Sequence, residues 1–224
     1  MSKALVKYAH AVIATDVVIF TVRDGKLNVL LIKMKKHPYE KAWALPGGLV
    51  SGAESLEDSA RKHLKEKAGV TNVYLEQLAA FGEPERDPFG RVVSVAYFAL
   101  IPAEAQKLRT TEEYGDVAWF PLSRLPSLAY DHKEITRAAL ARLCVKLEYT
   151  NIAYSLLPNQ FPLSALQDLY EIILDRELDK RNFRKKFLSL GLVALLKGKR
   201  SSGAHRPAQL YRFKEHTPMN IVML

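Results

Sequence analysis

The sequence is poor in cysteine: Cys144 is the single residue of this type among 224. One cysteine excludes an intramolecular disulfide, which fits a protein of a reducing compartment. Because Cys144 falls in a segment with helical spacing, we expect it to act as a small apolar residue rather than as a nucleophile. We therefore expect a cytoplasmic protein whose fold depends on no disulfide.

Long hydrophobic runs are also missing. No stretch reaches the ~20 apolar residues that a membrane-spanning helix needs. The first apolar segment, residues 9–20, contains His10 and Asp16 and lacks the form of a signal peptide. Apolar residues make up 48% of the chain and charged residues 25%, as in ordinary globular proteins. These features predict one or two globular domains and no membrane partner.

Acidic residues are scarce between positions 176 and 214. This segment holds two, Glu177 and Asp179, against twelve lysines and arginines. It therefore carries a charge of +10, whereas the rest of the chain carries about −1 and the whole chain +9. A charge concentrated in one segment attracts a polyanion to that part of the molecule. We therefore expect two domains with different partners.

The first part of the chain alternates between strand and helix patterns. Two β-branched runs, residues 11–20 and 27–34, flank an Asp24-Gly25 turn and predict a hairpin. Apolar residues recur at helical spacing from Leu56 to Ala68, with Gly69 as the C-cap. Further strands are predicted at residues 73–81, 92–101 and 117–120. This pattern predicts a mixed α/β domain that ends near residue 125.

An amphipathic helix over residues 132–147, capped by Asp131, is predicted to connect this domain to the next. We place the domain boundary at its end, with a first domain over residues 1–147 and a second over 148–224. In the second domain Ser164 and Gln167 have the form of a capping box. They predict a helix that runs to about Leu174.

A second helix in this domain is predicted to begin at Asp179 and to end at Gly191. Two strands, residues 192–196 and 209–213, then flank a basic tip over residues 197–207. Helix, turn, basic helix and basic hairpin together predict a winged helix-turn-helix.

On a helical wheel of residues 179–191, Phe183, Phe187 and Leu190 form one apolar face. The opposite face carries arginine and asparagine, which read guanine and adenine edges with two hydrogen bonds. Flanking cations suit phosphates on either side of a groove. The alternative interpretation of this basic face is that it is an ordinary solvated helix surface that binds no DNA. The residues predicted to bind DNA are Arg181, Asn182, Arg184, Lys185, Lys186, Ser189, Lys199, Arg200, His205 and Arg206.

An RNA-binding sheet would place aromatic rings outward. Tyr211 and Phe213 alternate with Arg212, so we expect both rings to face inward. This pattern favours DNA over RNA.

Residues 43–48 read Trp-Ala-Leu-Pro-Gly-Gly, and a spaced pattern of 23 positions starts at Gly48. The pattern resembles the Nudix box, G-x5-E-x7-R-E-U-x-E-E-x-G-U, in which U is aliphatic. The matching residues are Gly48, Glu54, Leu64, Glu66, Gly69 and Val70. The resemblance implies an α/β/α sandwich around a mixed sheet.

The departures from the box concern its metal site. In active Nudix hydrolases, carboxylates at the i, i+3 and i+4 positions of the helix bind Mg²⁺, which prepares water for attack on a pyrophosphate. These positions are here His63, Glu66 and Lys67, and Lys62 replaces the arginine. One carboxylate beside an ammonium group is a poor site for a hard dication. We therefore predict no metal, no catalytic residue and no Mg²⁺-dependent hydrolysis.

A basic helix can still bind a diphosphate directly. A solvated helix face remains the alternative for Lys62, Lys65 and Lys67. Residues 85–95 resemble a loop and strand common in the ADP-ribose-type Nudix branch, and we expect Arg86 and Arg91 to reach phosphates. A hairpin turn with exposed arginines is the alternative. The predicted ligand-binding residues are Gly47, Gly48, Glu54, Lys62, Glu66, Arg86 and Arg91.

A degenerate Nudix box followed by a basic winged helix-turn-helix resembles the Nudix-related transcriptional regulators, the NrtR-like family. The resemblance implies a bacterial repressor without a required cofactor, which binds a palindromic operator in double-stranded DNA as a homodimer. It also implies a small-molecule effector, ADP-ribose in the NAD-metabolism branch and sugar derivatives in others.

Two other functions stay open at this point. In the first, Glu54, Glu66 and His63 build an unusual metal site, and the chain is an active ADP-ribose pyrophosphohydrolase with a nucleic-acid-binding appendage. In the second, the chain is an RNA-binding adaptor.

Overall fold

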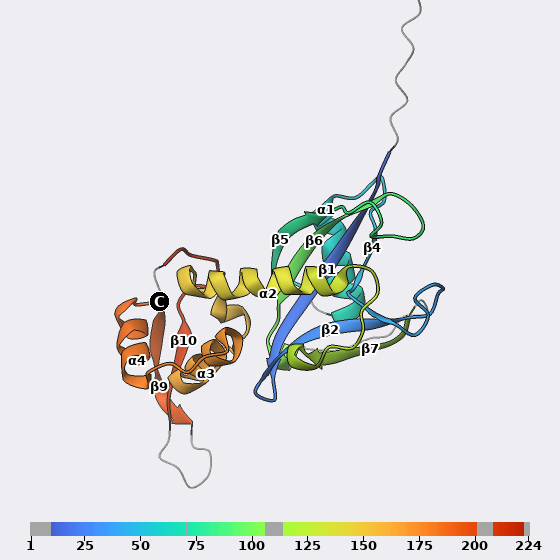
Figure 1. The fold of residues 1–224 in the computed structure, drawn as a ribbon. Helices are drawn as coiled ribbons and strands as arrows, with labels where there is room; N and C mark the ends of the chain where they lie inside the picture. The colour runs from blue at the N-terminus through green and yellow to red at the C-terminus, as the bar shows by residue number, and fades with distance from the viewer. Residues whose placement is uncertain (1–9, 70, 106–113, 201–207, 222–224) are drawn as a thin grey trace, which may run out of the picture.

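The computed structural model describes residues 10–69, 71–105, 114–200 and 208–221. Two parts lie at opposite ends of one long helix, α2 (His132–Tyr149), as Figure 1 shows. A mixed sheet with a helix on each face makes up the N-terminal part, and a small helical unit with a three-stranded sheet makes up the C-terminal part. No helix in the described residues combines the length and the apolar character needed to cross a membrane.

The N-terminal sheet has seven strands in the described residues. They are β1 (Val12–Arg23), β2 (Lys26–Met34), β3 (Trp43–Ala44), β4 (Gly47–Leu49), β5 (Tyr74–Phe81), β6 (Val92–Leu100) and β7 (Tyr114–Pro121). Their order is β3-β2-β1-β6-β5, with β4 paired to β1 and β7 paired to β2. The pairing of β1 with β6 is parallel and the others are antiparallel. The predicted strands are therefore confirmed, with small shifts at their ends.

Two apolar cores lie on the two faces of this sheet. Val18 and Phe20 of β1 pack on the side of α2, whereas Val17 and Ile19 pack with Ala60 of α1 (Leu56–His63) on the other side. This alternation follows the two-residue period of a strand. The predicted α/β/α sandwich is confirmed. Short 3₁₀ turns complete the connections: η2 (Ala103–Ala105), η3 (Leu122–Arg124) and η4 (Ile152–Ser155).

The predicted hairpin between β1 and β2 is present, with Asp24 at φ 51° and Gly25 at φ 67°. Two successive positive φ angles are typical of the tight turns that match strand twist. The two glycines of the box lead-in, Gly47 and Gly48, form the short strand β4 against Asp16 and Thr15 of β1. A Cβ atom on Gly47 would lie 2.2 Å from Oδ1 of Asp16, so this position requires glycine.

The helix of the Nudix-like box widens in its second half. α1 continues into a π-helical turn, η1 (Leu64–Ala68), which ends at Gly69 with φ 67° as the predicted C-cap. With this turn, His63 and Lys67 are both buried and Glu66 is exposed. A solvated face is therefore the wrong interpretation for Lys67. A π-turn of this kind is frequent at functional sites.

The C-terminal part contains two helices and a three-stranded sheet. Its elements are β8 (Phe161–Pro162), α3 (Leu163–Leu174), α4 (Lys180–Ser189), β9 (Val193–Arg200) and β10 (Ala208–Phe213). The sheet order is β8-β10-β9. Two helices followed by a two-stranded wing confirm the predicted winged helix-turn-helix.

The caps of its two helices differ. Asp179 caps α4 as predicted, because its Oδ1 accepts the backbone N–H of Asn182 at 2.8 Å. The capping box predicted at Ser164 is wrong: α3 begins one residue earlier, after Pro162, without a side-chain cap. The side chain of Gln167 instead donates to Glu171 and to the carbonyl of Leu178, each at 2.9 Å. These bonds hold the turn between the two helices.

Candidate functional site

A cavity of about 250 Å³ opens beside the Nudix-like box. Its wall is formed by β1, β2 and β4, by the loop that contains Arg86, and by the segment before α2. Apolar side chains such as Ile32 and Leu45 line one part, and Asp16, Arg86 and His132 line another. An apolar cavity with a few converging polar groups is the usual form of a small-molecule site.

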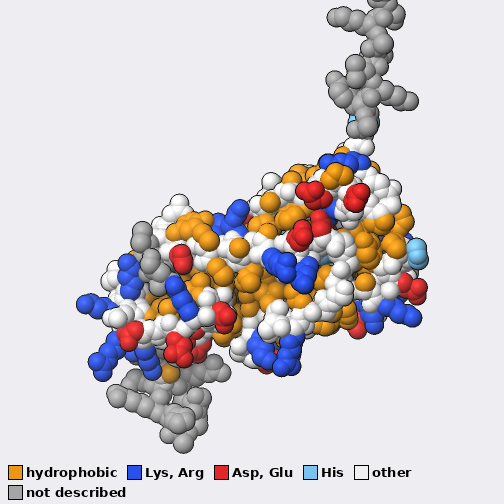
Figure 2. Space-filling view, in the orientation of Figure 1, with side chains coloured by type: hydrophobic (Ala, Val, Ile, Leu, Met, Phe, Trp, Pro, Cys, Tyr) orange, Lys and Arg blue, Asp and Glu red, His pale blue; other side chains and the backbone are white. Residues whose placement is uncertain are grey.

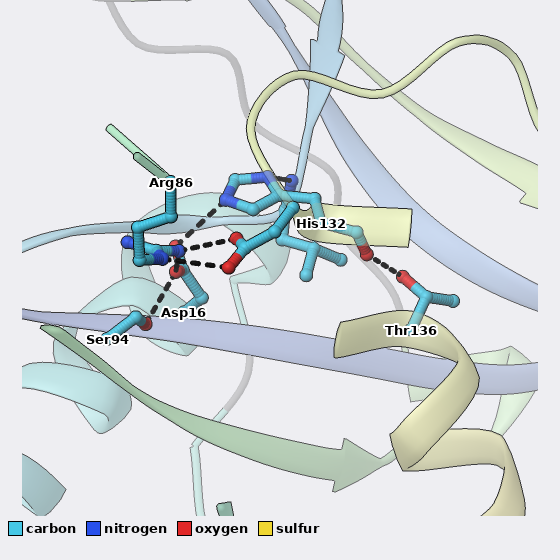
Figure 3. A network of polar contacts seen from close by, with 7 residues as sticks. Asp16, Arg86, Ser94, His132 and Thr136 are labelled. Carbon is cyan, nitrogen blue, oxygen red and sulfur yellow. Dashed lines mark hydrogen bonds and ion pairs between the residues drawn. The ribbon is translucent and has the colours of Figure 1, made fainter. Parts of the chain in front are cut away.

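The polar wall of the cavity is a buried ion network, drawn in Figure 3. Arg86 donates from Nε to Oδ2 of Asp131 at 2.8 Å and from Nη2 to Oδ1 at 2.6 Å. Its Nη2 also lies 3.4 Å from Oδ2 of Asp16, which accepts the hydroxyl of Ser94 at 2.6 Å. The side chain of Arg86 is 3% exposed, so its charge is balanced almost entirely by the two carboxylates.

Burial raises the pKa of Asp16, but the neighbouring His132, the hydroxyl of Ser94 and Arg86 together lower that pKa to about 2. Nδ1 of His132 accepts the backbone N–H of Leu45 at 2.9 Å, and its Nε2 lies 3.4 Å from Oδ1 of Asp16. A ring that accepts at Nδ1 carries its proton at Nε2. His132 therefore donates to the carboxylate of Asp16 while its other nitrogen holds the loop before β4.

Tyr130 lies at the edge of the cavity, immediately before Asp131. Its φ angle of 53° belongs to the left-handed region, which a bulky side chain rarely adopts. Its ring lies 4.3 Å from that of Tyr39 and 5.2 Å from that of His132, measured between centroids. The start of α2 is thus held in an unusual conformation by the contacts of the cavity wall.

The box residues do not provide the donor set of a Mg²⁺ site. Glu54 accepts the backbone N–H of Ser51 at 3.0 Å and the ammonium of Lys62 at 3.1 Å, and these contacts, led by the backbone bond, lower the pKa of Glu54. Glu66 is exposed, and the inward positions belong to His63 and Lys67. Mg²⁺ requires oxygen ligands in octahedral geometry, so this set does not fit the metal that Nudix hydrolases use.

His63 is the buried ring beneath Gly48. A Cβ atom on Gly48 would lie 3.2 Å from Cε1 of His63, and neither ring nitrogen has a hydrogen-bond partner in the described part of the chain. Desolvation, followed by the charge of Lys62, lowers the pKa of His63. The first metal-binding position of the box therefore holds a buried imidazole in place of a carboxylate.

The predicted ligand-binding residues fall into two groups. Gly47, Gly48 and Arg86 line the cavity. The others lie elsewhere: Lys62 lines a separate hollow of about 390 Å³ on the outer side of α1, where it pairs with Glu54. Arg91 is exposed and donates to the carbonyl of Gly82 at 2.6 Å. An exposed turn, the alternative for both arginines, is thus wrong for Arg86, which is buried.

At the other end of the molecule, α4 exposes a basic face. Phe183 and Phe187 are buried, as the helical wheel predicts, and Leu190 is half-buried. Lys and Arg side chains project around this end in Figure 2. The exposed residues of α4 from the predicted DNA-binding set are Arg181, Asn182, Arg184, Lys185, Lys186 and Ser189. No side chain of this group pairs with a carboxylate in the described residues, so the cations are available to phosphates.

The wing is described in part. The backbone of Lys199 and Arg200 belongs to β9, which pairs with β10. His205 and Arg206, predicted to bind DNA at the wing tip, lie outside the described residues. Tyr211 and Phe213 are buried and Arg212 is exposed, as predicted. The inward rings leave this part of the sheet without the aromatic platform of an RNA-binding surface.

Comparisons with known proteins match both halves of this arrangement. A NUDIX domain family model matches residues 12–143, and a model of the NrtR DNA-binding winged helix domain matches residues 153–213. A relative from Acinetobacter baylyi, described as an ADPR responsive transcriptional repressor NtrR, is 40% identical over 210 residues, which cover 92% of this chain and 83% of the relative. The chain belongs to the NrtR family.

Solved structures of the NrtR family support the same fold. The crystal structure of Shewanella oneidensis NrtR complexed with a 27mer DNA matches with a TM-score of 0.80 and 33% identity, and it covers 90% of this chain and 93% of that chain. The NUDIX domain of the same protein complexed with ADP ribose matches with a TM-score of 0.55 and 36% identity, over 61% of this chain and 90% of that chain. Both parts of an NrtR protein are thus present in this chain.

One relative of this NrtR-family chain is described as an enzyme. The ADP-ribose pyrophosphatase of Methanocaldococcus jannaschii is 32% identical over 130 residues, which cover 58% of this chain and 73% of the enzyme. Regulators and hydrolases therefore share this domain.

Sequence reasoning missed three residues of the cavity wall, Asp16, Tyr130 and His132. It also missed Asp131 as the ion-pair partner of Arg86. One signal was available, because Asp16 is an isolated carboxylate within the apolar run of residues 11–20. A charge in a buried strand has to be paired. Its partners come from residues 70 and 116 positions further along the chain, which spacing within a motif does not indicate.

Proposed function

We propose that this chain is an ADP-ribose-responsive transcriptional repressor whose effector binds in the cavity beside Arg86. This proposal rests mainly on the similarity to the relative from Acinetobacter baylyi, which shares 40% identity over nearly the whole chain. The cavity supports it, because its apolar part suits a base and its carboxylates suit the hydroxyls of a ribose. The guanidinium of Arg86 suits a phosphate.

The DNA partner is double-stranded and read by α4. We infer a homodimer that presents two recognition helices to the two halves of a palindromic operator, because two-fold symmetry in the protein is matched by two-fold symmetry in the site. We keep the division into residues 1–147 and 148–224. Within this division the first part senses the effector and dimerises, the second part binds DNA, and no cofactor is required. We expect the protein to act in the bacterial cytoplasm.

The test uses the full chain and an operator selected from a random pool of duplexes. Operator affinity is measured by fluorescence anisotropy with and without saturating ADP-ribose. ADP-ribose is expected to weaken binding about 5- to 150-fold, the usual range of allosteric coupling. The same titration with sugar phosphates decides between a nucleotide effector and a sugar effector. Equal operator affinities with and without every ligand would refute the proposal.

Arg181→Ala is expected to weaken operator binding by ~1–3 kcal/mol and to relax preference at one base pair, because an arginine on the exposed face of α4 reads a base edge. The measurement is affinity for the operator and for its single-base variants. Arg176→Ala serves as the control, since Arg176 is exposed but precedes α4 and lies 3.8 Å from Glu148. If Arg181→Ala discriminates between bases as well as the wild type, Arg181 does not face the groove.

Hydrolysis is the competing function. We infer that the wild type does not hydrolyse ADP-ribose to AMP and ribose 5-phosphate with Mg²⁺, because Glu54 is paired with Lys62 and the inward box positions are His63 and Lys67. The double variant His63→Glu, Lys67→Glu restores the carboxylates and is expected to gain Mg²⁺ binding. At a Mg²⁺ concentration about 100 times the Kd, the bound metal adds ~2.7 kcal/mol to the free energy of unfolding. The variant's melting temperature should then rise by about 5–10 °C with Mg²⁺.

The wild type's melting temperature should stay constant in the same Mg²⁺ titration. Mg²⁺-dependent turnover of ADP-ribose by the wild type would make the chain an enzyme and would contradict this part of the proposal.

A further inference from the structure

The first turn of α2 joins the cavity to the helix that leads into the winged helix domain. Asp131 occupies the N-cap position of α2, yet its side chain forms no capping bond. An aspartate at an N-cap normally accepts a backbone N–H from the first turn. The carboxylate of Asp131 is instead bound by both Nε and Nη2 of Arg86. One carboxylate therefore has two mutually exclusive partners: Arg86, which lines the cavity, and the N-terminus of its own helix.

The backbone around Asp131 is also outside the usual capping geometry. Asp131 has φ −91° and ψ 18°, whereas an N-cap residue normally has extended angles. Tyr130, which lines the cavity, adopts the left-handed region. The left-handed backbone of Tyr130 is a strained conformation of the kind that clusters at ligand sites and switch regions.

Arg86 has capacity for another anion. Nη1 takes part in none of the contacts found among the described residues, while Nε and Nη2 hold the two carboxylates. A phosphate that accepts from Nη1 and Nη2 together competes with Asp131 for Nη2.

The far end of α2 is bonded to the segment that follows the wing. Asn151 accepts the N–H of Met219 at 2.7 Å and donates to the carbonyl of Thr217 at 3.1 Å. The N–H of Ile221 donates to the carbonyl of Tyr149 at 2.7 Å. Near that end, Glu76 of β5 pairs with Arg142 and Lys146, which gives α2 a fixed point on the sheet. α2 therefore links the cavity wall at its first turn to the segment that follows the wing at its last turn.

We propose that a phosphate of the effector takes Arg86 from Asp131 and that the freed carboxylate then caps α2, which changes the setting of this helix and lowers operator affinity. This inference rests on the proposed function. It names Asp131 as a positioning residue that does not need to touch the effector. With the effector bound, a phosphate pair replaces the Arg86–Asp131 pair and a helix cap is added, so the loss of that ion pair is offset.

Asp131→Asn tests the exchange in the full chain. Asparagine caps as well as aspartate but lacks the charge that holds Arg86. The variant should bind ADP-ribose about tenfold more tightly than the wild type, because no ion pair has to be broken. Without effector it should bind the operator as weakly as the wild type does with effector. Both constants are measured, by calorimetry and by fluorescence anisotropy.

Two further variants serve as a contrast and a control. Asp131→Ala frees Arg86 but cannot cap, so it should bind ADP-ribose tightly without a comparable loss of operator affinity. Glu134→Gln removes an exposed acidic charge from the same turn and should retain both wild-type constants. Wild-type constants for Asp131→Asn would overturn the proposal.

A measurement on the wild type decides the matter if Asp131→Asn is unstable. Hydrogen exchange of the first-turn amides of α2 should slow when ADP-ribose binds, and unchanged exchange would overturn the capping step. If ADP-ribose binds and slows this exchange but leaves operator affinity unaltered, the proposed function fails while the exchange of partners stands. If ADP-ribose alters operator affinity without affecting these amides or the Asp131→Asn constants, the proposed function stands and this inference fails.

Discussion

Arg86→Ala is expected to lower the free energy of unfolding by about 3–5 kcal/mol, one of the two largest effects of a single substitution that we expect in this chain. The side chains of Asp16 and Asp131 are 9% and 13% exposed, and both bind the guanidinium. Removing it leaves these two largely buried carboxylates without the cation that pairs with both. Denaturant unfolding at pH 7 measures the difference.

The pH dependence identifies the cause. The pKa of Asp16, at about 2, lies below its ordinary value of 3.8, so its ionised form stabilises the fold at pH values above 3.8 and this stability is lost as the pH falls through 2. Without Arg86 the pKa of Asp16 rises. The deficit of the variant should therefore shrink as the pH is lowered from 7 towards 3. A deficit that is constant over this range would indicate lost packing rather than unpaired charge.

Arg91→Ala is the matched control for Arg86→Ala. Arg91 lies in the same loop region but is exposed, and it donates a hydrogen bond to the carbonyl of Gly82. Its replacement should cost no more than about 1 kcal/mol. Arg86→Lys keeps the charge but loses the planar fork, so it should recover part of the stability and not all of it.

Sequence patterns predicted the elements of this fold well because they report local backbone preferences. The hairpin turn at Asp24-Gly25 and the caps at Gly69 and Asp179 are each decided within a few residues. The capping box at Ser164 failed for a reason outside such a window. Gln167 finds better partners in Glu171 and in the carbonyl of Leu178, and that carbonyl is eleven residues away.

The candidate site was harder to predict, because its polar groups meet only after folding. The box motif drew attention to Gly47 and Gly48, which line the cavity, and the strand register explains why Gly47 must lack a Cβ atom. Spacing alone placed His63, Glu66 and Lys67 on one helix face, but the π-turn leaves Glu66 exposed. Asp131 shows the same limit, since its position predicts a cap while its carboxylate is bound by an arginine 45 residues earlier.

Phe187→Ala is expected to remove ~3–5 kcal/mol from the stability of the winged helix domain, since large-to-small changes in a core combine lost burial with a cavity. Phe187 is 1% exposed, and its ring centroid lies 5.7 Å from that of Phe183, 6.0 Å from that of Phe213 and 6.5 Å from that of Tyr170. These rings hold α4 against α3 and β10. Operator binding should therefore be lost at 37 °C.

The value of Phe187→Ala lies in what it should leave intact. If residues 1–147 hold the effector site as proposed, ADP-ribose affinity measured without DNA should stay within about twofold of the wild type, because distant sites contribute independently. Leu188→Ala is the control, since Leu188 is the next residue of α4 and is 39% exposed. It should preserve the fold. Loss of ADP-ribose binding in Phe187→Ala would mean that the apolar cluster running from Val18 to Phe213 unfolds as one unit, and that the chain does not divide near residue 147.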